Sequence, residues 1–158
     1  MTNTGEIDRA ATNRIAEQFM MLLAERKWDE WSDLWAEDGV LEFPFAPPGR
    51  RSRYEGKVDI LNYMKAAVGK MKIDTVDYYE VYPMLDPSMV CMEMGLKGHI
   101  VATSLPLHQR YVSIFQTGEG KLRHYREYWN PIASMDANGG REVWTAAFGS
   151  PEQEGAGK

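Results

Sequence analysis

The segment YVSIFQTGEGKLRHYREYWNP, residues 111–131, decides the fold that the sequence predicts. Two runs rich in Val, Ile, Tyr and Phe flank the glycine-containing turn GEG, a pattern typical of an antiparallel hairpin. Two more runs of this kind precede it, separated by the turn signal Asp86-Pro87-Ser88. We therefore predict an antiparallel meander of four strands, over residues 73–84, 89–105, 109–116 and 121–129.

The first half of the chain has helical periodicity instead. Between Glu6 and Ala24, apolar residues recur at spacings of three and four, which places them on one stripe of a helix. Trp28, Trp31 and Trp35 predict a second, shorter helix that the Asp38-Gly39 pair closes. A short strand is expected over 40–45, and Gly56 is expected to open a third helix with Ile60, Met64 and Ala67 on its apolar face.

Helices followed by long meandering strands indicate an α+β fold, with the helices packed on one face of a strongly bent sheet. At 158 residues, with 44% apolar residues, the chain fits one domain with a real core. We expect this domain to cover residues 1–149, with a short helix over 141–148, and residues 150–158 to form a disordered tail.

Composition excludes several classes of function. The net charge is −5, and Lys and Arg are scattered apart from Arg50, Arg51 and Arg53, so no extended basic surface is available for nucleic acid. We interpret this short cluster as a solvated loop tip after Pro47-Pro48-Gly49, with anion binding as the alternative. No segment has the length and apolarity of a membrane span or signal peptide, so we expect no membrane partner.

Cysteine and histidine usage points away from disulfides and metals. Cys91 is the single cysteine, and no Cys/His spacing matches a zinc site. A reducing compartment suits such a chain. The sequence therefore predicts a soluble, cytoplasmic protein that binds no metal.

The order of elements, together with LWAEDGVLEFPF (34–45), YEGKVDILNYM (54–64) and the final hairpin, resembles the SnoaL-like branch of the NTF2-like superfamily. The resemblance covers residues 6–136 and is nearest to the phenazine-biosynthesis proteins of the PhzA/PhzB type. It implies a cone in which three N-terminal helices pack on a strongly curved, mainly antiparallel sheet, and it implies a homodimer. Because this scaffold hosts isomerases, cyclases, dehydratases, epoxide hydrolases and pure binders, the fold does not define a reaction.

The resemblance retains one catalytic position. The glutamate on the last strand of the phenazine proteins falls on Glu127, while their histidine, serine and arginine fall on Tyr63, Ala67 and Trp31. In ketosteroid isomerases, the proton-moving Asp and the oxyanion-binding Tyr fall on Phe43 and Phe19. A phenyl ring cannot exchange a proton, so classical ketosteroid isomerisation is not expected.

An epoxide hydrolase is less favoured still. Limonene epoxide hydrolases share the last-strand carboxylate but also need an Arg-x-Asp pair, for which residues 92–98 offer only Glu93 and Lys97.

Strand alternation places Arg123, Tyr125, Glu127 and Trp129 on one face of the last strand, and His124 on the other. If the first face is the concave one, the neighbouring rings desolvate the Glu127 carboxyl and raise its pKa, which suits acid/base catalysis. The alternative is a structural ion pair of Glu127 with Arg123 or Arg110.

Other side chains are candidates for substrate binding. The aromatic ones are expected as pocket walls, although core packing is the alternative for each: Tyr63, Tyr111, Tyr125, Trp129 and Trp31. His108 lies at the mouth of a hairpin, where loops often join sites. Glu93 could supply a second carboxylate across the pocket, or it could pair with Lys97 on a solvated face.

Two hypotheses follow. In the first, the protein is an enzyme of secondary or aromatic-compound metabolism that isomerises, cyclises or dehydrates a small hydrophobic, cyclic substrate, with Glu127 as acid or base and no cofactor. In the second, it is a non-catalytic ligand-binding or dimerisation module, which is favoured by the loss of the relatives' partner residues at Phe19, Phe43, Tyr63 and Ala67.

Overall fold

The computed structural model describes residues 9–47 and 49–148, which form five helices and six strands. The start of the predicted first helix and the predicted tail at 150–158 lie outside the described residues. The helices are α1 (Arg9–Ala24), α2 (Trp28–Asp33), α3 (Lys57–Gly69), α4 (Pro131–Ala137) and α5 (Arg141–Phe148). The strands are β1 (Trp35–Glu42), β2 (Arg53–Glu55), β3 (Met71–Pro83), β4 (Met89–Ile100), β5 (Pro106–Gly118) and β6 (Lys121–Trp129).

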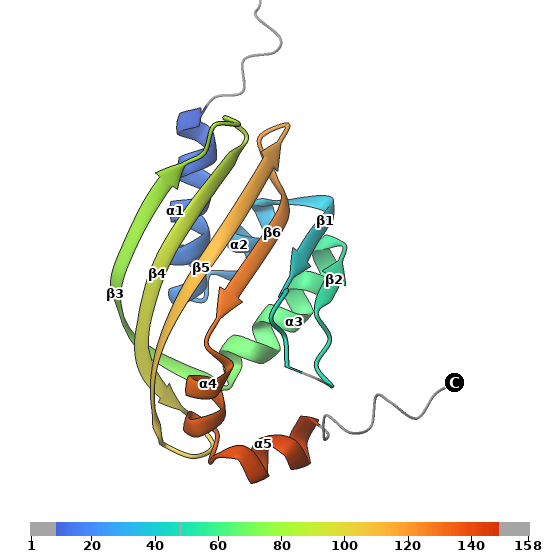
Figure 1. The fold of residues 1–158 in the computed structure, drawn as a ribbon. Coiled ribbons are helices and arrows are strands. Elements are labelled where there is room, and N and C mark those ends of the chain that lie inside the picture. The colour runs from blue at the N-terminus through green and yellow to red at the C-terminus, as the bar shows by residue number, and fades with distance from the viewer. Residues whose placement is uncertain (1–8, 48, 149–158) are drawn as a thin grey trace, which may run out of the picture.

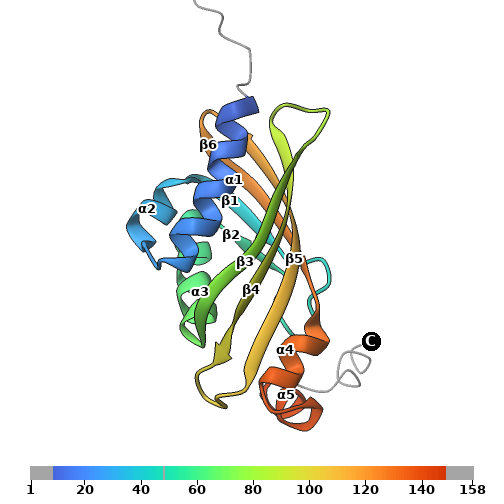
Figure 2. The same cartoon turned by 90° about the vertical axis from the view of Figure 1, so that its left-hand side faces the viewer.

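The strands form one sheet in the order β2-β1-β6-β5-β4-β3. Neighbours are antiparallel except β1 and β6, which run parallel, and the connection through α3 and the meander is long enough to allow this. The sheet bends strongly along β3 to β5, with α1, α2 and α3 on one face and α4 and α5 at one end (Figures 1 and 2). The expected α+β fold with a curved, mainly antiparallel sheet and the four-stranded meander are confirmed.

The helices pack through the stripes that the sequence predicts. In α1, Ile15, Phe19 and Leu23 are buried, and in α3 the buried residues include Ile60 and Met64. Removing each such side chain from water contributes about 1.5–3 kcal/mol, so these stripes fix both helices on the sheet. The left-handed conformation of Gly56 (φ 86°) precedes α3, as expected for the residue that opens this helix.

The interpretation of Trp35 as a helical residue is wrong. Helix α2 ends at Asp33, and the Leu34 carbonyl accepts a hydrogen bond from the Leu122 amide at 2.7 Å, so the chain enters the sheet at once. Trp35 is the first residue of β1, and the predicted turn at Asp38-Gly39 lies inside that strand, at a shift of register. A Cβ on Gly39 would lie 2.7 Å from the Trp35 ring, so glycine makes room for the ring there.

Two elements lacked a prediction. Strand β2 has only three residues, too few for a period to show. Helix α4 begins at Pro131, with the Asn130 side chain accepting a hydrogen bond from the Ile132 amide at 3.0 Å. Asn before Pro is a known start signal for a helix, so α4 was predictable. No helix among the described residues has the length and apolarity needed to cross a bilayer.

Candidate active site

A cavity of about 260 Å³ lies between α3, the concave face of the sheet and α4. Its wall is mostly apolar and aromatic, with a small number of polar side chains. The lining residues are contributed by α1 (Leu23), the β1–β2 connection (Phe43, Arg50), α3 and its end (Tyr63, Met64, Ala66, Ala67, Val68, Lys70), β3 and β4 (Met71, Ile73, Met94, Leu96, Ile100), β5 and β6 (Tyr111, Glu127, Trp129), and α4 and its end (Ser134, Asn138).

Glu127 is the one carboxylate among these lining residues, and only 8% of it is exposed. The Tyr125 hydroxyl donates a short hydrogen bond to Glu127 Oε2. That hydroxyl also lies 2.9 Å from Ser113 Oγ, and Ser113 is the residue directly opposite Glu127 on β5. This buried chain of three polar groups fixes one carboxylate oxygen of Glu127.

Burial raises the pKa of Glu127 to about 7, and the hydrogen bond from Tyr125 only partly opposes this effect. The alternative interpretation, an ion pair between Glu127 and Arg123 or Arg110, is not found among the described residues. Arg123 pairs with Glu119 at 3.2 Å and Asp38 at 3.3 Å, and Arg110 lies over the Tyr78 ring at 4.8 Å. Both arginines are thus engaged elsewhere, and Glu127 has a neutral hydrogen-bond partner.

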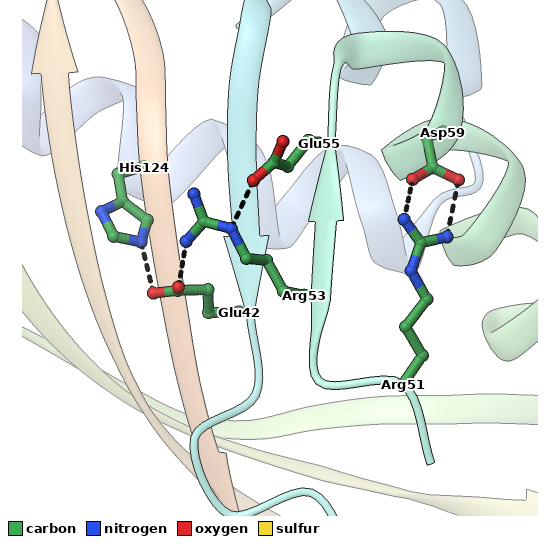
Figure 3. A network of polar contacts seen from close by, with 6 residues as sticks. All are labelled: Glu42, Arg51, Arg53, Glu55, Asp59 and His124. Atoms are coloured by element: carbon green, nitrogen blue, oxygen red, sulfur yellow. Dashed lines mark hydrogen bonds and ion pairs between the residues drawn. The ribbon is translucent and has the colours of Figure 1, made fainter.

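The predicted alternation along β6 holds at three of its four inward positions. Tyr125, Glu127 and Trp129 face the interior, and His124 points the other way, to Glu42 Oε2 at 2.6 Å (Figure 3). Arg123 departs from the pattern because the pairing of β5 with β6 shifts register between Gln116 and Thr117. A bulge of this kind moves a side chain to the other face.

Four of the other predicted binding residues lie at or beside Glu127. Tyr63, Tyr111 and Trp129 line the cavity, and Tyr125 lies behind Glu127, where its ring stacks on Phe19 at 4.6 Å. Burial raises the pKa of Tyr63 and of Tyr111 above the usual range, with the Glu127 carboxylate adding to it in both cases. Both phenols therefore stay protonated as hydrogen-bond donors at neutral pH.

The remaining three lie elsewhere. Trp31 is fully buried in an aromatic cluster with Phe19 (5.1 Å between ring centroids), which is the core-packing alternative. His108 pairs with Asp77 at 3.1 Å on the outer face of the sheet. Glu93 lies on that face too and accepts a hydrogen bond from the Tyr78 hydroxyl at 3.4 Å, while Lys97 pairs with Asp77 instead.

Arg50 is a cavity residue that sequence reasoning assigned to a solvated loop tip. Its guanidinium lies 6.0 Å from the centroid of the Trp129 ring, and its charge acts on the Tyr63 phenol, where it opposes the rise in pKa. The other two arginines of the cluster do face outward, since Arg51 pairs with Asp59 and Arg53 with Glu55 at 2.5 Å (Figure 3). Within the described ranges, no group of three or more His, Cys, Asp and Glu side chains could hold a metal ion.

The sequence matches a known family. The profile of the SnoaL-like domain matches residues 16–125, and the chain belongs to this family. The uncharacterised protein YesE of Bacillus subtilis is 36% identical over 132 residues, which are 84% of this chain and 90% of YesE. An uncharacterised PhzA/B-like protein of Pseudomonas aeruginosa is 35% identical over 113 residues, which are 72% of this chain and 79% of the relative. The resemblance drawn from the sequence is thereby confirmed.

Solved structures agree. A Bacillus subtilis protein named as a candidate isomerase has 34% sequence identity and a TM-score of 0.78, over 84% of this chain and 95% of that chain. A Mycobacterium tuberculosis protein in complex with estradiol-17beta-hemisuccinate has the same fold, with a TM-score of 0.65 at 16% identity, over 76% of this chain and 94% of that chain. At this identity, the likeness shows a shared fold.

Proposed function

We propose that the protein is a cofactor-independent enzyme that isomerises, cyclises or dehydrates a small hydrophobic, cyclic substrate, with Glu127 as the acid or base. One observation carries this proposal: the single carboxylate in the cavity wall is buried, held by Tyr125, and has its pKa raised to about 7. A group that titrates near neutral pH is populated in both protonation states, as a proton carrier must be. Since Tyr125 holds Oε2, we assign the exchange of protons with the substrate to Oε1.

The cavity volume supports a small substrate. Drug-sized ligands occupy pockets of roughly 300–1,000 Å³, whereas about 260 Å³ suits one or two rings. Phe43, Met64 and Trp129 offer it an apolar wall. The candidate isomerase at 34% identity is consistent with proton transfer. We place the reaction in secondary or aromatic-compound metabolism, where such substrates arise.

Proton transfer can be tested without the natural substrate. The protein is incubated in D₂O with small cyclic ketones such as 2-tetralone and 2-cyclohexenone, and deuterium uptake next to the carbonyl is followed by NMR. Glu127→Gln keeps the shape of the side chain and removes its basicity, so exchange above the buffer rate is expected to fall at least about 100-fold. Glu93→Gln, on the outer face, is the matched control and is expected to retain exchange. Undiminished exchange in Glu127→Gln refutes the proposal.

A second candidate, a non-catalytic binding module, is favoured by the apolar residues Phe19, Phe43 and Ala67 at positions where related enzymes carry polar ones. The two candidates differ in how ligand binding depends on pH. In a pure apolar binder, titration of Glu127 does not change the affinity for a neutral ligand. The native protein and Glu127→Gln then show the same dependence of affinity on pH. Calorimetric titrations of both proteins between pH 5 and 9 distinguish them.

We also propose that the protein is a cytoplasmic homodimer. Tyr82 and Val112 are 41% and 40% exposed on the outer face of the sheet, which gives a second copy apolar surface to cover. Sedimentation at micromolar concentration tests this, and a monomer throughout contradicts it.

A further inference from the structure

Tyr63 and Arg50 form a polar pair in the wall of the cavity that also contains Glu127. Tyr63 comes from α3 and Arg50 from the connection between β1 and β2, so the pair joins two elements that are separate in the fold. The charges of Arg50 and Glu127 both act on the Tyr63 phenol, and they shift its pKa in opposite directions. The pair therefore lies near the carboxylate that the proposed function uses.

The Tyr63 ring is held in place by other rings. It stacks on Tyr54 with 4.0 Å between centroids and an interplanar angle of 29°, and it contacts Phe43 at 5.3 Å. Arg50 in turn lies over the Trp129 ring. A hydroxyl fixed in this way needs little rearrangement when charge develops beside it, which is what makes a preorganised donor effective.

The chemistry of the pair defines what it offers to a bound substrate. A phenol has one O–H donor and two acceptor lone pairs, whereas a guanidinium only donates. The Tyr63 O–H and the Arg50 N–H groups are therefore both donors from which an oxyanion in the cavity can accept a hydrogen bond. Hydrogen bonds from an ionised donor are stronger than those from a neutral one, so Arg50 beside Tyr63 adds to the stabilisation of a negative charge.

We propose that Tyr63, supported by Arg50, is the donor that stabilises an oxyanion on the substrate when Glu127 removes the neighbouring proton. This inference rests on the proposed function and narrows it to substrates with a carbonyl group next to an acidic C–H. The Glu127 carboxylate takes the proton, the C–H electron pair becomes the C=C bond of an enolate, and the C=O π pair moves onto oxygen. Return of the proton from Glu127 to another carbon of the enolate completes an isomerisation.

Tyr111 is the competing donor, because it lines the same cavity. Among the described residues, the ionisable groups that act on Tyr111 are Glu127 and Tyr63, and neither of them is a cation. An enolate beside Tyr111 would thus have only the phenol to compensate its charge, whereas beside Tyr63 it has the guanidinium as well. This difference favours Tyr63.

The test uses phenols as stable mimics of an enolate, in the Glu127→Gln background that mimics the protonated carboxyl. Binding of 4-nitrophenolate and 2-naphtholate is followed by absorbance and fluorescence. We expect Tyr63→Phe to weaken phenolate binding at least about 10-fold, and Arg50→Met to weaken it similarly, with partial recovery in Arg50→Lys. Arg53→Met, which removes an arginine of the same segment from the outer face, is the matched control.

In the otherwise native protein, Tyr63→Phe is expected to slow deuterium exchange into 2-tetralone about 100-fold, as loss of an oxyanion donor does. If phenolate affinity is unchanged in both Tyr63→Phe and Arg50→Met, this inference is overturned. It is also overturned if Tyr111→Phe loses more phenolate affinity than Tyr63→Phe does. Neither result affects the role of Glu127, which depends on exchange in Glu127→Gln. Conversely, exchange retained in Glu127→Gln refutes the proposed function, while the phenolate comparison still tests Tyr63.

Discussion

The buried Glu127 carboxyl is expected to reduce the stability of the folded protein at and above neutral pH. Its pKa is about 7 in the folded state against an ordinary value of 4.5. A difference of about 2.5 between the two pKa values corresponds to about 3 kcal/mol, at about 1.36 kcal/mol for each factor of ten. Glu127→Gln removes this cost because the amide does not ionise.

The sign of the effect follows from proton binding. Below pH 4.5 the carboxyl is protonated in both states and costs nothing. Between pH 4.5 and 7 the unfolded chain releases the proton while the folded protein keeps it, so the free energy of unfolding falls as pH rises. Above pH 7 the loss is complete.

Urea unfolding of the native protein and of Glu127→Gln at pH 4.5 and pH 8.5 measures this directly. Relative to the native protein, the variant should gain about 3 kcal/mol between the two pH values, and the contributions of all other titrating groups cancel in the comparison. A difference in stability that is the same at both pH values refutes the reasoning, as does a gain by the native protein.

Three further substitutions have defined outcomes. Tyr125→Phe removes the hydrogen bond that favours the Glu127 carboxylate, so the pKa of Glu127 should rise by about 1 in a carboxyl ¹³C NMR titration; a fall contradicts the assignment. Ala67→Leu should fill part of the cavity and weaken 2-tetralone binding at least about 10-fold by calorimetry, which fails if the ligand lies elsewhere. Gly98→Ala would place a Cβ 1.9 Å from the Lys72 carbonyl oxygen, so thermal unfolding should show a loss of at least about 2 kcal/mol, and unchanged stability would contradict this close contact.

Local periodicity was enough to predict the layers of the fold. The stripe that contains Phe19, the helix opened by Gly56 and the alternation around Glu127 each depend on neighbours in sequence, and each lies where the pattern placed it. Trp35 shows the limit of this reasoning. Its spacing from Trp31 is helical, but pairing with β6, 87 residues later at Leu122, draws it into the sheet. A long-range contact of this kind leaves no trace in a local pattern.

Prediction of the site residues depended even more on which distant segments the fold brings together. Arg50 belongs to a cluster whose other members face outward, and only the path of the chain after Phe43 brings its guanidinium to the cavity. Glu93 and His108 carry suitable chemistry, but strand alternation directs them to the outer face. A residue type can be read from the sequence, whereas its face and its partners depend on register.

If Glu127 exchanges protons near neutral pH, its carboxyl must titrate there, and this titration can be measured. The protein is labelled with ¹³C at glutamate carboxyl carbons, and the resonance that disappears in Glu127→Gln is followed between pH 3 and 10. We predict a midpoint near pH 7, as burial of this carboxyl requires. A midpoint near 4.5 would mean that water reaches the carboxylate freely, and it would contradict the account.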